Sequence, residues 1–250
     1  MSQSVCKLVA EMIPLKTSPG LQLTATDVNG ICHVAVLDAN EKLNLPWDRY
    51  MRLKVVSDHL RRLVGTKKRA RILDVGGFDG ALALFLSEYE VDLIDPATTS
   101  GSGLEIPLSD REYEIVVSID VIEHVTPDKR SMLIKELTRI SNSICLINFP
   151  NKATMPAQEL VYALTGNSFV REHVELGLPE KRWVMEEMQS HQFDCQVVPN
   201  TNLAIWTAQH TLSCLHPQAA ATVSRYLVQA HSEEQFSVPL YYLVIGMRRQ

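Results

Sequence analysis

The stretch Ile72-Leu73-Asp74-Val75-Gly76-Gly77-Phe78-Asp79-Gly80 decides the fold class of this sequence. A short apolar run enters glycines, and the segment from Ala81 to Tyr89, ALALFLSEY, then predicts a mostly apolar helix. Glycines at the carboxyl end of a strand let the backbone approach a ligand and turn sharply into a helix. The pattern predicts a strand, a glycine-rich turn and a helix, although a buried turn without a ligand has the same composition.

Three more apolar runs follow, from Val91 to Ile94, from Tyr113 to Ile119 and from Ser143 to Phe149. Between the last two, Thr126-Pro127-Asp128 supplies an N-cap, a proline at the first helical position and an early carboxylate. Leu133, Ile134, Leu137 and Ile140 then share one helical face. Apolar strands that alternate with helices predict a doubly wound α/β domain with a parallel sheet covered on both faces.

The flanking segments have different patterns. Leu21 to Thr26 and Ile31 to Leu37 predict a hairpin around Asn29-Gly30, and Trp47 to Val64 predicts an amphipathic helix that ends at Gly65. Residues 1–65 are therefore expected to form a lid or dimer element, and residues 66–250 the main domain. Lid insertions are expected around 151–180 and 201–236. The C-terminal part predicts helices over Pro156–Leu164, Lys181–Ser190 and Ala204–Ala230, with strands over Phe193–Val198 and Tyr241–Met247.

Composition excludes several classes of protein. The 250 residues are 46% apolar and 21% charged, which excludes a disordered chain, and no apolar run is long enough for a membrane span. Five cysteines without a C-x-x-C pair make a disulfide framework or a thiolate zinc site unexpected and favour a reducing cytoplasm. The net charge of -5 disfavours nucleic acid as a partner. The basic run from Arg61 to Arg71 fits a solvated helix end or a phosphate-bearing substrate.

Carboxylates stand at three successive strand ends. Asp74 lies near the end of the first strand, Asp95 follows the second, and Asp120 follows the third. Ligands of open α/β sheets bind outside the carboxyl ends of the strands, where an acid after the second strand can accept both hydroxyls of a ribose. Any one of these acids could cap a helix, but three together predict a nucleoside-like ligand.

The segments Ile72–Gly80, Val91–Asp95 and Tyr113–Val125 resemble the motifs of class I S-adenosylmethionine-dependent methyltransferases. Within them, Asp120-Val121-Ile122-Glu123-His124-Val125 is similar to the D-V-L-E-H-V segment of the branch that includes ubiquinone-type and many small-molecule methyltransferases. The resemblance covers about residues 70 to 150. It implies a Rossmann-like, mostly parallel seven-stranded sheet, with helical additions at the N-terminus and in the C-terminal part.

The same resemblance implies S-adenosylmethionine as the cofactor and S-adenosylhomocysteine as the product. It implies that the glycine turn holds the methionine moiety, Asp95 the ribose, and Glu105 and Ile106 the adenine, with Asp120 and Val121 on the pocket floor. The full set of implied cofactor-binding residues is Asp74, Gly76, Gly77, Phe78, Gly80, Asp95, Pro96, Glu105, Ile106, Asp120 and Val121.

Two departures from the family pattern stand out. Phe78 occupies the place of the middle glycine of the turn, where its ring either narrows the methionine slot or points into the core. Only 24 residues separate Asp95 from Asp120, too few for the usual helix and third strand. We expect a mobile loop and a short strand from Leu104 to Ile106. Asn148-Phe149-Pro150-Asn151 resembles the N-P-P-Y box of amino-methylating nucleic-acid enzymes, but it follows the wrong strand.

Methyl transfer from a sulfonium needs an aligned acceptor and, for oxygen or nitrogen acceptors, often a base. His124 and His173 are the candidate bases, although a histidine after a strand end is often a capping or packing residue. Trp183, Trp206, Tyr162 and Phe169 either line an acceptor pocket or belong to the core. The histidines lack metal-ligand spacing along the chain, so no metal is expected.

These features predict an enzyme that transfers a methyl group by in-line displacement to a small-molecule or carrier-linked acceptor, with a homodimer as a candidate assembly. A non-catalytic, methyltransferase-like binding protein is the first alternative, favoured by Phe78 and the short segment after Asp95. An NAD-dependent oxidoreductase is the second. It fits less well, because G-x-G-x-x-G would need a glycine at position 78.

Overall fold

The computed structural model describes residues 17–65, 70–232 and 238–249. Part of the basic run (Lys67, Lys68 and Arg69), residues 1–16 of the expected N-terminal element and residues 233–236 of the second expected lid segment lie outside these residues. In the part of the chain that is described, no helix is long and apolar enough to cross a membrane.

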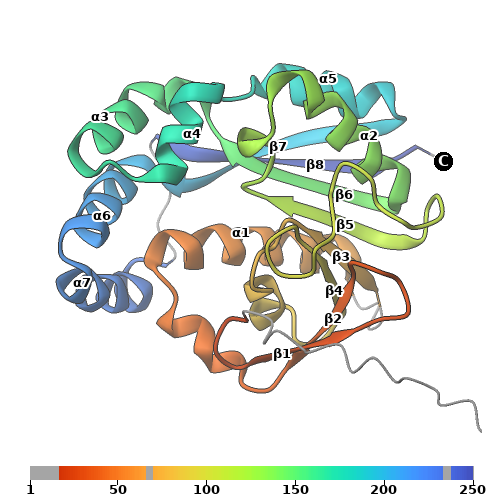
Figure 1. The fold of residues 1–250 in the computed structure, drawn as a ribbon, viewed down its shortest axis with the longest axis horizontal. Helices are drawn as coiled ribbons and strands as arrows, with labels where there is room; N and C mark the ends of the chain where they lie inside the picture. Colours follow the sequence, from red (N-terminus) through yellow and green to blue (C-terminus); the bar gives the residue numbers. More distant parts are fainter. Residues whose placement is uncertain (1–16, 66–69, 233–237, 250) are drawn as a thin grey trace, which may run out of the picture.

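Four parallel strands form the centre of the sheet (Figure 1). They are β3 (Arg71–Val75), β4 (Glu90–Ile94), β5 (Tyr113–Ile119) and β6 (Ser141–Pro150). Successive side chains of a strand point to opposite faces, and both faces are buried here: Ile72 packs into one apolar cluster and Leu73 into the other. The four strands expected from the apolar runs are confirmed.

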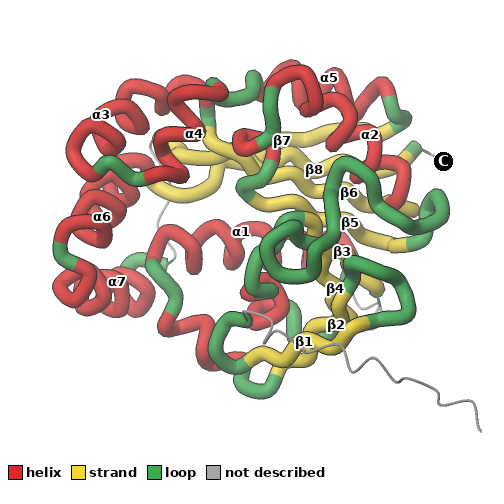
Figure 2. Tube along the Cα trace, viewed as in Figure 1, coloured by secondary structure: helices red, strands yellow, loops and turns green. Residues whose placement is uncertain are grey.

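Antiparallel strands extend this centre on both sides. The sheet has eight strands in the order β1-β2-β4-β3-β5-β6-β8-β7, where the resemblance implied seven. The edge strands are β1 (Leu21–Ala25), β2 (Cys32–Val36), β7 (Phe193–Asn202) and β8 (Pro239–Arg248). Helices cover both faces of the sheet (Figure 2). The α/β, Rossmann-like fold class is confirmed, with one more strand than expected.

The extra strand comes from the N-terminal hairpin. β2 pairs with β4 through Cys32 opposite Leu93, so the hairpin occupies the edge where a strand from Leu104 to Ile106 was expected. That expected strand is wrong: only an isolated bridge from Ser102 to Glu105 forms in the segment. This segment packs closely against the hairpin turn. The approach leaves no space for a side chain at position 101, since a Cβ on Gly101 would collide with the carbonyl oxygen of Gly30.

One face of the sheet is covered by α1 (Trp47–Val64), with Leu60 and Val56 fully buried in its apolar cluster. The helix expected from Ala81 to Tyr89 is instead a short 3-10 helix, η2 (Ala81–Phe85), whose five residues are all buried. α1 contacts η2, and together they cover this face of the sheet, where the sequence predicted a longer second helix. Gly80 precedes η2 in the left-handed region at φ 78° and offers no capping side chain.

The opposite face is covered by α2 (Arg130–Ile140) and α5 (Lys181–Ser190). The expected apolar stripe of α2 is confirmed, since Leu133, Ile134, Leu137 and Ile140 are all buried. The expected start of this helix differs. Pro127–Lys129 form a 3-10 turn, η4, and the side chain of Thr126 makes no capping hydrogen bond.

Four helices gather at one end of the sheet, on the left of Figure 1. They are α3 (Met155–Thr165), α4 (Ser168–Leu176), α6 (Leu203–Leu215) and α7 (Pro217–Ala230). α4 was missed, although the Asn167 side chain caps it by accepting from the backbone N–H groups of Phe169 and Val170. Three further 3-10 turns are η1 (Ala39–Asn44), η3 (Ile122–His124) and η5 (Lys152–Thr154).

The single long helix expected from Ala204 to Ala230 is wrong. It is divided into α6 and α7 at His216, which has φ −141° and ψ 71°. A residue before proline is driven out of the helical region by the proline ring, and Pro217 then starts α7.

We expect Leu60→Ala to lower the free energy of unfolding by about 2–5 kcal/mol, because Leu60 is fully buried between α1 and the sheet. Leu164→Ala on α3 is the matched control. Its side chain is 54% exposed, so the change should stay within about 0.5 kcal/mol. Urea denaturation followed by circular dichroism measures both. Equal midpoints for the two variants would contradict the packing of α1 described here.

Candidate functional site

A cavity of about 670 Å³ lies at the carboxyl ends of the central strands. Small-molecule sites are commonly clefts of about 300–1,000 Å³. The expected site residues that line it are Asp74, Gly76, Gly77, Phe78, Asp95, Pro96, Asp120, Val121, His124 and His173. Two of the four aromatic residues considered for an acceptor pocket, Phe169 and Trp206, also line it.

Three expected cofactor residues do not line the cavity. Gly80 faces the hairpin, where an added Cβ would lie 3.2 Å from Val34. Ile106 is 3% exposed and belongs to the apolar cluster on the α2 face, and Glu105 beside it is exposed. The reason is the lack of a strand here: the backbone carbonyl of Ile106 instead accepts a hydrogen bond from Arg139 at 3.0 Å.

The glycine turn packs closely on its neighbours. Gly76 has φ 78°, and a Cβ on it would collide with the side chain of Val121. A Cβ on Gly77 would collide with the carboxylate of Asp74. Only glycine fits these two positions, because one needs a left-handed backbone and both lack space for a side chain.

Asp74 is a buried acid without a hydrogen bond at Oδ1 among the described residues. Burial raises its pKa to about 7, the carboxylate of Asp95 adds to the rise, and Arg49 opposes it. A buried carboxylate with an incomplete set of partners is costly and favours a cationic or hydrogen-bonding ligand.

Asp95 holds the loop that follows β4. Its Oδ1 accepts from the backbone N–H groups of Ala97 at 2.8 Å and Thr98 at 3.1 Å. Its Oδ2 accepts from the backbone N–H of Phe78 at 3.1 Å, which connects the loop to the glycine turn. Asp95 therefore organises the cavity wall, whatever ligand it also contacts.

Two residues of the cavity adopt a left-handed backbone that side chains rarely take. Phe78 has φ 54° and Asp120 has φ 57°. The Phe78 ring is 40% exposed, so it lies along the cavity wall and not in the core. Unfavourable backbone conformations persist where the surrounding contacts impose them, and they cluster at functional sites.

Asp120 is fixed by two residues that the sequence did not indicate. Arg52, from α1, forms an ion pair with its Oδ2, and Asn148, at the end of β6, donates to its Oδ1 at 2.8 Å. Burial raises the pKa of Asp120, while Arg52 and Asn148 act in the opposite direction. Arg52 also donates to the hydroxyl of Tyr241 at 2.7 Å. Asn148 of the N-F-P-N segment thus lies within β6, near its end, and positions Asp120.

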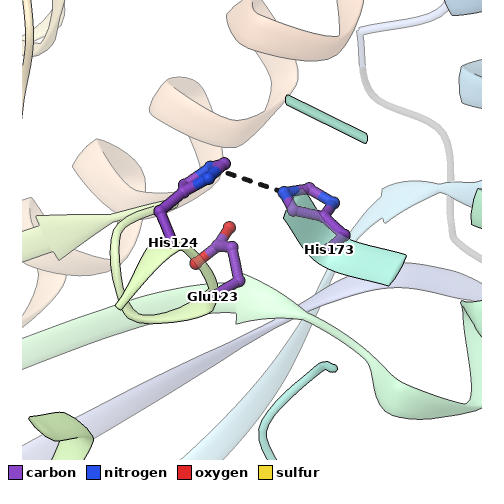
Figure 3. A group of neighbouring side chains, drawn as sticks. All are labelled: Glu123, His124 and His173. Atoms are coloured by element: carbon purple, nitrogen blue, oxygen red, sulfur yellow. Dashed lines mark hydrogen bonds between the residues drawn. The ribbon is translucent and has the colours of Figure 1, made fainter. Parts of the chain in front are cut away.

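The structure brings the two candidate bases together. Nε2 of His124 lies 3.4 Å from Nε2 of His173, with Glu123 beside them (Figure 3). Burial, His124 and Arg52 lower the pKa of His173 to about 3. Burial and Asp120 raise the pKa of the fully buried Glu123 well above its usual range. His173 comes from α4 and the other two from η3, so their proximity depends on the packing of α4 against η3.

Sequence reasoning missed several residues of this cavity. Asp48, Arg49 and Arg52 come from α1, which was assigned to a separate N-terminal element, and Tyr241 lies near the start of β8. Arg52 follows Asp48 and Arg49 by one helical turn, and this spacing was the available signal. Their partners were not readable, because Arg52 pairs with Asp120 and Arg49 with Asp79, which lie 68 and 30 residues away along the chain.

No family model matches this chain, and no curated protein matches its sequence. Solved structures do match. One is a candidate methyltransferase from an antibiotic biosynthesis pathway of Anabaena variabilis, with a TM-score of 0.50 and 12% identity over 82% of this chain and 99% of that one. At this identity the likeness shows the fold alone.

Two further matches have lower TM-scores. A candidate sarcosine dimethylglycine methyltransferase from Galdieria sulphuraria has a TM-score of 0.49 and 12% identity over 80% of this chain and 86% of that one. Magnesium protoporphyrin IX methyltransferase from Synechocystis, solved with bound S-adenosylhomocysteine, has a TM-score of 0.49 and 9% identity over 81% and 86% of the chains.

Asp74 makes the stability of the ligand-free protein depend on pH. Its folded pKa of about 7 exceeds the usual value of 3.8, so between these pH values the folded state binds more protons than the unfolded state. The stability from this group is complete below about pH 4 and is lost as pH rises to about 7. Asp74→Asn should therefore gain stability relative to wild type as pH rises from 5 to 7, by about 2–3 kcal/mol.

Urea unfolding at pH 5 to 8 measures this difference. Asp128→Asn is the control, because Asp128 is exposed and its pKa is lowered by the Thr126 hydroxyl. The difference in the free energy of unfolding between Asp128→Asn and wild type should not change over the same pH range. A difference between Asp74→Asn and wild type that is constant with pH would refute the raised pKa.

Proposed function

We propose that this chain is an S-adenosylmethionine-dependent methyltransferase that acts on a small-molecule or carrier-linked acceptor. The observation that carries the proposal is that Asp74, Asp95 and Asp120, from three strand ends, line one cavity with the glycine turn. A Rossmann-like sheet places ligands at this edge. The fold matches support the proposal only at the level of the sheet.

The residues at the turn fit the cofactor. Asp74 presents a buried oxygen without a partner among the described residues, which suits the ammonium of the methionine moiety. Asp95, with Pro96 and Ala97 beside it, supplies the carboxylate for the ribose hydroxyls. When bound, S-adenosylmethionine supplies a methyl group on a positively charged sulfur. Gly76 and Gly77 keep this part of the wall free of side chains.

The acceptor side of the cavity is formed by α4, α6 and η3. Phe169, Trp206 and Tyr241 give it aromatic surface, and His124, His173 and Glu123 give it polar groups. The Phe169 ring is 66% exposed although it lines the cavity, so α4 presents an apolar side chain at its rim. Such a wall fits a flat or apolar acceptor body that carries one polar reacting group.

A non-catalytic binding protein is the second candidate, and Phe78 is the observation that favours it. Its exposed ring lies on the cavity wall where the family pattern has a glycine. An aromatic ring in this place narrows the site, so the affinity for the cofactor decides between the two functions.

Calorimetric titration at pH 8 with S-adenosylmethionine, S-adenosylhomocysteine and NAD tests the proposal. We expect the two sulfur nucleosides to bind and NAD not to bind. Asp95→Asn and Asp74→Asn should each weaken binding by roughly 10- to 100-fold, because a hydrogen bond to a charged group contributes about 1.5–3 kcal/mol. Asp74→Asn is the cleaner variant, since Oδ1 of Asp74 has no hydrogen-bond partner among the described residues, whereas Asp95 holds three backbone N–H groups.

Asp110→Asn is the control, because this carboxylate is 75% exposed and pairs with Arg139 outside the cavity. It should bind like wild type. Binding of NAD alone would assign the protein to the oxidoreductases. Binding of the sulfur nucleosides without methylation of any acceptor would favour the non-catalytic protein, and no binding at all would overturn the proposed cofactor.

A further inference from the structure

The imidazole rings of His124 and His173 point their Nε2 atoms toward each other. Nδ1 of His124 lies 2.6 Å from Oε2 of Glu172, and Nδ1 of His173 lies 3.2 Å from Oε1 of Gln158. An oxygen beside each Nδ1 favours the tautomer in which Nδ1 carries the proton and donates it, and a ring in that tautomer keeps a lone pair on Nε2. In these tautomers the two Nε2 atoms face each other at 3.4 Å with no proton between them.

Glu123 adds a third unsatisfied group at the same point. Its side chain is fully buried, and neither carboxylate oxygen has a hydrogen-bond partner among the described residues. The ligand atoms of Glu123, His124 and His173 all lie within 4.8 Å of one another, and the three side chains converge in Figure 3. Burying a carboxylate without a partner is strongly unfavourable, and two facing lone pairs repel. One cation between the three would satisfy them all.

The distance between the imidazoles agrees with a single ion. Metal to imidazole nitrogen bonds are about 2.0–2.1 Å, so two such nitrogens on a tetrahedral ion lie about 3.3–3.4 Å apart. The Nε2 atoms of His124 and His173 lie at this separation. We propose that Glu123, His124 and His173 bind one divalent transition-metal ion, such as Zn²⁺ or Mn²⁺.

The groups around the three ligands also suit a metal. A metal-ligating histidine usually donates its other ring N–H to a carboxylate or carbonyl oxygen, which orients the ring. Glu172 and Gln158 do this for His124 and His173. Two imidazoles and one carboxylate select transition metals over Ca²⁺, which prefers oxygen ligands alone. The spacing of these residues along the chain did not reveal the site, because His173 comes from a separate helix.

The ion would have an open position toward the acceptor. Glu123, His124 and His173 all line the cavity. An ion that is four-coordinate and has these three protein ligands keeps at least one coordination position open to the cavity. This consequence rests on the proposed function and makes the acceptor a hydroxyl compound. The ion lowers the pKa of the hydroxyl, whose proton passes to water. The oxygen of the deprotonated acceptor hydroxyl then forms a bond to the methyl carbon. The carbon–sulfur bond breaks at the same time, and its electron pair stays on sulfur.

In this arrangement His124 and His173 are ligands and do not act as bases. Their lone pairs are directed at the ion, and their Nδ1 protons are held by Glu172 and Gln158. The catalytic role expected for these histidines is thereby replaced by a role in metal binding.

Metal binding is tested without cofactor or acceptor. Full-length protein is treated with a chelator, dialysed and titrated with Zn²⁺ and with Mn²⁺ alone, with heat and the Mn²⁺ paramagnetic resonance signal as readouts. We expect one ion per chain and a metal-dependent rise in Tm. Glu123→Gln and His173→Gln should each lower the affinity at least about 100-fold, since outer contacts alone change it by about 10–100-fold.

His210→Gln is the matched control. His210 is a histidine of the same cavity that stacks on Trp206 and is not one of the three ligands. It should keep the wild-type affinity for the metal. The Tm of each chelator-treated variant shows whether it is folded, and Glu123→Gln should fold well because it removes a buried charge.

Two outcomes would overturn the site: no stoichiometric ion in the wild-type chain, or equal affinities in wild type, Glu123→Gln and His173→Gln. Titration of the same samples with S-adenosylhomocysteine separates this inference from the proposed function. Metal binding without nucleoside binding would overturn the proposed function alone. Nucleoside binding without metal binding would overturn the metal site alone.

Discussion

Burial of the central strands on both faces determines where this protein can place polar groups. β3, β4, β5 and β6 are covered by α1 on one side and by α2 and α5 on the other. A charged side chain within these strands would have to be paired inside the core. Asp95 and Asp120 follow their apolar runs, and because parallel strands end at the same edge, the two acids line one cavity there with Asp74, which lies near the end of β3.

Because several acids lie at this edge of the sheet, the cavity needs positive charge to balance them. Arg52 pairs with Asp120 and Arg49 pairs with Asp79, and both arginines come from α1. Asp74 and Glu123 retain buried oxygens without partners among the described residues. Two cations of different kinds would complete the site: the ammonium of a nucleoside cofactor at Asp74 and a metal ion at Glu123. The two proposals are thus linked by one electrostatic requirement, although they concern different groups.

α1 shows how the fold and the site depend on each other. Its apolar face covers the sheet where η2 is too short to do so, and its charged residues reach the carboxyl ends of the strands. The hairpin before it similarly completes the sheet beside β4. The division of the chain at residue 65 remains a prediction, but residues on both sides of it line the same cavity. A model of the site built from residues 66–250 would lack Arg52.

The sequence by itself determined the local elements. Its apolar runs, the Asn29-Gly30 turn and the limits of α1 and α5 agree with the structure, because they depend on short-range propensity and burial. The division at His216 was also readable from Pro217. Only the tertiary structure decided that the hairpin replaces a strand, that Asn148 and Arg52 hold Asp120, and that His173 meets His124 and Glu123. These contacts join segments 28 to 68 residues apart, and local propensity carries no information about such pairings.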